Sequence, residues 1–158
     1  MQSASEPDAV SGVPLWRRLA AALYDGMIVL ALWFIGTALV MPLSRAAVAP
    51  DHPLAELVYR LYLLAIGYAF FAGFWIRDGQ TLGMLAWRVK LTQSGNGNTV
   101  TWKQALVRYV AALLSWAALG AGFWWSLFDG ECKTWHDRLS GTELHRAVPV
   151  AANPDPKI

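Results

Sequence analysis

The sequence contains few charged residues for its length. Asp, Glu, Lys and Arg make up 15% of the 158 residues and hydrophobic residues 56%, whereas an average soluble domain is about 25% charged. A single domain of this size cannot bury so much apolar surface in one core, so we expect a membrane protein. The net charge of +2 and the lack of a Lys/Arg cluster argue against nucleic acid as a partner.

The sequence is also poor in residues that build catalytic and metal sites. One cysteine, Cys132, and three histidines provide neither an intrachain disulfide nor the ligand spacing of a zinc site. There is no Gly-rich phosphate loop and no nucleophile elbow. A His next to an Asp, as at His136-Asp137, also occurs in metal-dependent phosphohydrolases, but those enzymes need several more metal ligands. We therefore predict no enzyme activity, no cofactor and no catalytic or metal-binding residue.

Three long apolar runs are present instead. They cover residues 19–41, 54–76 and 104–128, and about 20 helical residues suffice to cross a bilayer. Helix is the form that satisfies every backbone polar group within lipid. We predict an all-α membrane protein, a small helical bundle of two full spans plus a third hydrophobic helix, within a domain at 15–148. Residues 1–14 and 149–158 are predicted to be disordered.

The polar segment between the second and third runs has a pattern of its own. Residues 81–87 predict a short helix against the membrane interface. Residues 87–92 and 98–102 alternate apolar and polar side chains around a Gly- and Asn-containing loop, which predicts a small β-hairpin. Residues 142–148 could form one more strand that pairs with it, after a helical segment that ends near Leu139.

Basic residues flank the apolar runs unequally. The loop between the first two runs holds Arg45, with Arg60 just inside the second run. Seven lie at the start of the first run or in the segment 77–108: Arg17, Arg18, Arg77, Arg88, Lys90, Lys103 and Arg108. By the positive-inside rule, the N-terminus and the hairpin face the cytoplasm.

The third run leaves the side of the C-terminus open. A single crossing would place the C-terminal basic residues outside, against the charge rule. A break at Gly120-Ala121-Gly122 would return the chain to the cytoplasm and bring residues 142–148 within reach of the hairpin. We favour the broken helix.

Asp25 is the one charged residue of the first run. A charge at the centre of a spanning helix costs about 2.5–3.5 kcal/mol. Seven residues separate it from Arg18, so both side chains lie on nearly the same helix face. Such a carboxylate could bind and release protons or cations. Alternatively it could fix helix packing through a partner such as Arg138, Arg108 or Tyr68.

The segment Trp135-His136-Asp137-Arg138 is the second polar group of interest. Asp137 could pair with Arg18 or Arg17 at the cytoplasmic end of the first helix, as a polar latch. We name Arg18, Asp25 and Asp137 as the main polar network and Arg17, His136 and Arg138 as secondary members. This latch requires a cytoplasmic C-terminus.

Three ordered motifs resemble the RDD family of bacterial integral membrane proteins. They are WRRLAAALYDGMIV in the first run, DGQTLGMLAWRVKL after the second, and TWHDRLSGT near the end. The resemblance implies that the family's arginine and two aspartates are Arg18, Asp25 and Asp137. It also implies a location in the bacterial cytoplasmic (inner) membrane, and transport has been proposed for the family.

Two functions from different classes are consistent with these features. The first is a transport-related role coupled to a proton or small cation, with Asp25 as the titratable group. Three or four helices form a poor pathway alone, so this role implies a homo-oligomer. The second is a structural or accessory protein that packs against a partner membrane protein, with the Arg/Asp network purely structural.

Overall fold

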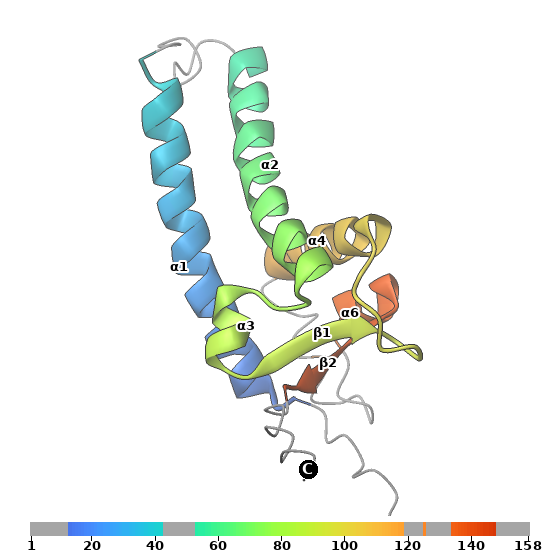
Figure 1. Ribbon diagram of the computed structural model, residues 1–158. Helices are drawn as coiled ribbons and strands as arrows, with labels where there is room; N and C mark the ends of the chain where they lie inside the picture. The colour runs from blue at the N-terminus through green and yellow to red at the C-terminus, as the bar shows by residue number, and fades with distance from the viewer. Residues whose placement is uncertain (1–12, 43–52, 119–124, 126–133, 148–158) are drawn as a thin grey trace, which may run out of the picture.

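Two long helices stand side by side in the computed structural model, which describes residues 13–42, 53–118, 125 and 134–147 (Figure 1). Helix α1 spans Leu15–Val40 and α2 spans Pro53–Arg77. Both are long and apolar enough to cross a membrane, which matches the first two predicted spans. Polar contacts join them: the indole of Trp33 donates to the carbonyl of Leu63 at 2.8 Å, and the hydroxyls of Thr37 and Tyr59 lie 2.7 Å apart.

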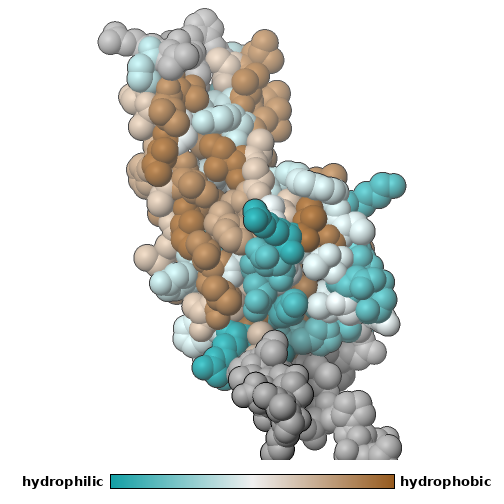
Figure 2. Space-filling view, in the orientation of Figure 1, coloured by the Kyte–Doolittle hydropathy of each residue, from teal (hydrophilic) through white to brown (hydrophobic). Residues whose placement is uncertain are grey.

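The surfaces of α1 and α2 are apolar over most of their length. Leu23 and Phe34 of α1 are 71% and 70% exposed, and Leu54 of α2 is 73% exposed. Figure 2 shows hydrophobic side chains along the helix pair and hydrophilic ones gathered at the end of the molecule where the sheet lies. A core helix of a soluble protein would bury such residues, so this exposure is typical of lipid-facing helices.

The remaining elements cluster at one end of the helix pair. They are α3 (Leu82–Ala86), β1 (Val89–Gln93), α4 (Trp102–Ala117), α6 (Trp135–Ser140) and β2 (Thr142–Arg146). Threonines begin three of the helices, because the hydroxyls of Thr81, Thr101 and Thr134 each accept a hydrogen bond from a backbone N–H in the first turn. Gly141, with φ of 62°, ends α6 and turns the chain into β2.

The sheet has two antiparallel strands, with Leu91 of β1 opposite Leu144 of β2. The predicted hairpin between residues 87–92 and 98–102 is therefore wrong, and the strand predicted near residues 142–148 is the partner of β1. The reason is local. Thr101 forms a capping box with Gln104 and begins α4, while Val100 is 2% exposed and packs in the core.

The third apolar run forms α4, which ends at Ala117. Neither the predicted break at 120–122 nor the predicted tail at 149–158 falls within the described residues. Of the predicted arm at 1–14, the structure describes Val13 and Pro14, and Val13 is 1% exposed. The main hydrophobic core lies where the start of α1 and the end of α2 meet α3, β1 and α4. It contains Val13, Ala21, Ala72, Trp75, Met84, Val89, Leu91, Val100, Ala105 and Tyr109.

Candidate functional site

Asp137 binds two arginines from two other helices. Its Oδ2 accepts from Nη1 of Arg18 in α1 at 2.6 Å, and its Oδ1 accepts from Nη1 of Arg108 in α4 at 2.5 Å. All three side chains are at least nine-tenths buried. Arg18 also donates from Nε to the carbonyl of Val13, and Arg108 donates to the hydroxyl of Thr142. One carboxylate thus joins α1, α4 and α6.

The electrostatics of Asp137 favour its charged form. The carboxylate closes the capping box of its own helix by accepting from the backbone N–H of Thr134 at 3.1 Å. Burial alone would raise its pKa, but the charges of Arg108 and Arg18, with the hydrogen bond from Thr134, hold the pKa well below its usual 3.8. The buried network therefore contains two cations and one anion.

His136 precedes Asp137 and is 5% exposed. Burial, and then the nearby charge of Arg108, lower its pKa from 6.5 to about 3. At neutral pH the imidazole is therefore uncharged.

Asp25 lies apart from this network. Its side chain is 2% exposed, its Oδ2 accepts from the hydroxyl of Thr81 at 2.5 Å, and its Oδ1 accepts from the backbone N–H of Gly83 at 2.8 Å. Gly83 permits this approach, because a Cβ there would lie 2.3 Å from the carbonyl oxygen of Ala21 and 2.9 Å from Oδ1 of Asp25. Asp25 thus fastens α3 to α1.

The partners that the sequence suggested for Asp25 are wrong. Arg108 binds Asp137, and the hydroxyl of Tyr68 donates to the carbonyl of Trp102 at 3.5 Å. Arg138 is exposed on α6. The actual partners, Thr81 and Gly83, carry no charge, so the pattern of charged residues in the sequence does not point to them.

The secondary residues have different places. Arg17 is half-buried with its guanidinium 5.1 Å from the ring centre of Trp16, so Arg18 and not Arg17 pairs with Asp137. Sequence reasoning did not place Arg108 in the latch. The sequence signal for this role is an arginine about two turns inside the largely apolar α4. An arginine at such a position is expected to have a carboxylate partner nearby.

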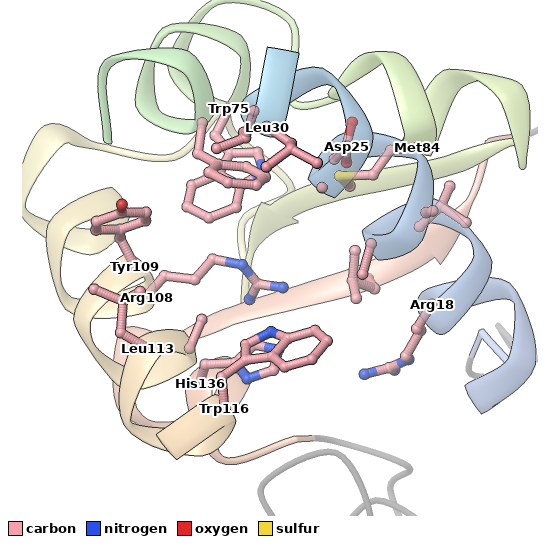
Figure 3. A pocket seen from close by; sticks show the side chains of 18 of the residues that line it. Arg18, Asp25, Leu30, Trp75, Met84, Arg108, Tyr109, Leu113, Trp116 and His136 are labelled. Atoms are coloured by element: carbon pink, nitrogen blue, oxygen red, sulfur yellow. The ribbon is translucent and has the colours of Figure 1, made fainter. Parts of the chain in front are cut away.

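A cavity of about 400 Å³ connects Asp25 with the arginines. It lies among α1, α2 and α4, and Arg18, Arg108 and His136 line one part of it (Figure 3). The rest of its wall is mainly apolar: Ala21, Ala22, Gly26, Val29, Leu30, Trp33, Phe71, Trp75, Met84, Val89, Tyr109, Ala112, Leu113, Trp116 and Leu144. Among the described residues, no three His, Cys, Asp or Glu side chains gather into a metal site.

Comparison with known proteins gives one match. The sequence model of the RDD family matches residues 13–141 of the chain. No curated protein and no solved structure gives a match. The matched range contains Arg18, Asp25, Arg108 and Asp137, together with every element that lines the cavity except β2.

Proposed function

Because this chain belongs to the RDD family, we propose that it is a multi-pass protein of the bacterial cytoplasmic membrane with a transport-related role, in which Asp25 takes up and releases a proton. The two long helices with exposed apolar surfaces support insertion into a bilayer. The excess of basic residues near the start of α1 and around β1 supports a cytoplasmic location for that end.

The observation that carries this proposal is the position of Asp25. It is a buried carboxylate within a candidate span, at the wall of a cavity. Ionisable groups at such positions are costly, and they commonly serve ion or proton pathways. Its direct partners, Thr81 and Gly83, are uncharged, so a proton is the simplest species that can balance its charge.

A proton fits the site better than a small cation does. Hard cations such as Mg²⁺ and Ca²⁺ take six or more oxygen ligands, but both carboxylate oxygens of Asp25 already accept hydrogen bonds. Arg18 and Arg108 line the same cavity and would repel a metal ion. We therefore narrow the coupling ion expected from the sequence to the proton.

The remaining parts of the site have supporting roles in this proposal. Arg18, Asp137 and Arg108 form a latch that holds α4 and α6 against the start of α1. Two spans enclose little space, and their outer surfaces are apolar. We propose that copies of the chain associate through these surfaces to complete the pathway, and that the protein is not an enzyme.

Asp25→Asn separates the charge of Asp25 from its structural role. The amide oxygen of asparagine can accept from Gly83, and its NH₂ group can donate to the hydroxyl of Thr81, so the contact with α3 is retained. Purified protein in liposomes that contain a pH-sensitive dye should move protons when a pH gradient is imposed, and Asp25→Asn should abolish this movement. Glu56→Gln, at an exposed carboxylate, is the matched control and should leave the flux unchanged.

Absence of flux from folded, inserted wild-type protein would contradict the proposal, as would full flux from Asp25→Asn. The second candidate, an accessory protein that packs against a membrane partner, would then be preferred. Its support is that every carboxylate oxygen of Asp25 and Asp137 accepts a hydrogen bond within the chain. An accessory protein should keep its partner and its function when Asp25 is replaced by Asn.

A further inference from the structure

The cavity has one polar end, where two guanidinium groups have donors left over. Arg108 uses both hydrogens of Nη1, for Asp137 and Thr142. Among the described residues, its Nε and Nη2 have no acceptor, and these two atoms form the edge that binds a carboxylate in bidentate fashion. Arg18 uses Nε for Val13 and one hydrogen of Nη1 for Asp137. Its Nη2 makes no hydrogen bond to a residue that the structure describes.

Figure 3 shows the side chains of Arg108 and Arg18 reaching into the cavity from α4 and α1, with His136 between them. The indole N–H of Trp75, whose ring centre lies 5.4 Å from Cζ of Arg108, also has no acceptor among the described residues. Several donors without acceptors therefore gather around one end of an otherwise apolar cavity.

The charge at this end is unbalanced. Arg18 and Arg108 carry two positive charges against the single negative charge of Asp137, and His136 is neutral. Asp25 also lines the cavity, but both of its oxygens accept from Thr81 and Gly83. One further anion beside the arginines would balance the pair.

The walls beyond the arginines suit a hydrocarbon chain. Val29, Leu30 and Trp33 of α1 and Leu113 and Trp116 of α4 line the cavity. Gly26 and Leu30 are exposed as well as lining it, so the cavity is open along α1. Small-molecule sites span about 300–1,000 Å³, and a cavity of about 400 Å³ favours one chain over the two of a phospholipid.

We propose that this cavity binds a single-chain amphipathic carboxylate of the fatty-acid class, with its carboxylate on the free edge of Arg108 and beside Arg18, and its hydrocarbon chain between α1 and α4. The role of this ligand as a transport substrate rests on the proposed function. Its binding at equilibrium does not. Neutral lipids lack the charge that the arginines need, and small anions such as acetate lack the chain that the walls accommodate.

Gly26 provides a way to fill the cavity without disturbing the latch. It lines the cavity, and a Cβ at Gly26 would meet no atom within 4 Å. Gly26→Leu should therefore occupy the space of the hydrocarbon chain and leave Arg18 and Arg108 in place. Gly73 in α2 is also exposed with nothing within 4 Å, and it does not line the cavity, so Gly73→Leu is the matched control.

The probe is a terminally brominated medium-chain fatty acid, because bromine quenches indole fluorescence and Trp33, Trp75 and Trp116 line the cavity. The full chain in phosphatidylcholine nanodiscs should show saturable quenching by the acid and only linear, partition-driven quenching by its methyl ester. Gly26→Leu should weaken the saturable binding by about tenfold or more, and Gly73→Leu should not change it. Equal quenching by acid and ester, or unchanged binding in Gly26→Leu, would overturn the proposal.

Two more variants keep the result distinct from that of the flux experiment. Arg108→Lys keeps the charge but removes the bidentate edge, so it should weaken binding of the acid while near-ultraviolet circular dichroism shows the fold intact. Asp25→Asn removes a negative charge from the cavity and should bind the acid at least as tightly, although it loses proton flux. Binding without any proton flux would refute the transport role alone, whereas flux without saturable binding would refute the ligand alone.

Discussion

At the scale of single residues, the site depends on one carboxylate shared by two arginines. Asp137 is 1% exposed and accepts from Arg18 and Arg108 through separate oxygens. A buried ion pair is weak evidence for net stability, because desolvation offsets much of the attraction. Removal of one partner is costly, however, since it leaves a charge buried without its counter-ion.

Asp137→Asn should therefore lower the free energy of unfolding in mild detergent by about 3–5 kcal/mol, since it strands two buried guanidinium groups. Thermal unfolding followed by circular dichroism measures this loss. The matched control is Glu56→Gln, which breaks the exposed ion pair with Arg60 and should cost about 1 kcal/mol or less. Similar losses in the two variants would show that the latch does not hold the fold together.

His136 should make stability depend on pH. Its pKa is about 3 in the folded protein against 6.5 when exposed, so the unfolded chain binds more protons between these values. Stability should fall as the pH drops below about 6.5, by about 1.4 kcal/mol per pH unit. Asp137, whose folded pKa is depressed, adds its own loss only near and below pH 3.8.

Unfolding in detergent between about pH 7 and pH 5 tests this dependence, since it spans the upper part of that window. His136→Gln, which cannot take up a proton, should flatten the slope relative to the wild type. A slope that persists unchanged in this variant would assign the pH dependence to other groups.

At the scale of elements, glycines that allow close contacts between helices set the geometry. Helix α3 has only five residues and is held to α1 by the hydrogen bonds from Thr81 and Gly83 to Asp25. Helix α4 approaches α2 closely where the hydroxyl of Tyr109 donates to the carbonyl of Leu64 at 3.0 Å. A Cβ at Gly67 would lie 2.6 Å from that hydroxyl oxygen.

Gly83→Ala should separate α3 from α1, because the new Cβ would lie 2.3 Å from a backbone oxygen that cannot rotate away. We expect a loss of about 1–3 kcal/mol in unfolding free energy, measured by thermal unfolding in detergent. Gly26→Ala on α1, where a Cβ meets nothing within 4 Å, is the control and should be neutral or gain up to about 1 kcal/mol. Equal effects of the two substitutions would contradict the close contact between α3 and α1.

At the scale of the whole molecule, polar contacts lie at one end of the helix pair. Strand β2 pairs with β1, and α6 is joined to the start of α1 through Asp137 and Arg18. The start of α1 and residues 134–147 therefore share one end of the molecule, while the end of α1 and the start of α2 lie at the other end (Figure 1). If the start of α1 is cytoplasmic, as we propose, residues 134–147 are cytoplasmic as well.

Cysteine accessibility tests this arrangement in the membrane. In a Cys132→Ser background, Lys90→Cys and Arg146→Cys should react with a membrane-impermeant maleimide in inverted vesicles and not in spheroplasts, since the exposed residues Lys90 and Arg146 lie on paired strands. Leu54→Cys, at the opposite end of α2, should show the reverse pattern. Labelling of Arg146→Cys and Lys90→Cys from opposite sides would contradict the sheet and the latch together.

Local sequence is enough to specify the two long apolar helices and the ends of several helices. The low charge and the apolar runs predicted the two long helices, because hydropathy and length are properties of local segments. The threonine caps and Gly141 set the helix ends through contacts a few residues apart. The pairing of Asp137 with Arg18 was also expected, from the polar segment that contains Asp137 and the arginines at the start of α1.

Which residues meet across the chain depends on tertiary packing. The partners of Asp25 are a hydroxyl and a backbone N–H, and such neutral donors leave no charge pattern in a sequence. The alternation of apolar and polar residues in 87–102 predicts a hairpin, but strand pairing depends on distant segments. Here β1 pairs with β2, which follows α4 and α6 in the chain. The role of Arg108 and the cavity that it lines likewise arise where α1, α2 and α4 converge, since a cavity is defined by packing between elements and not within any one of them.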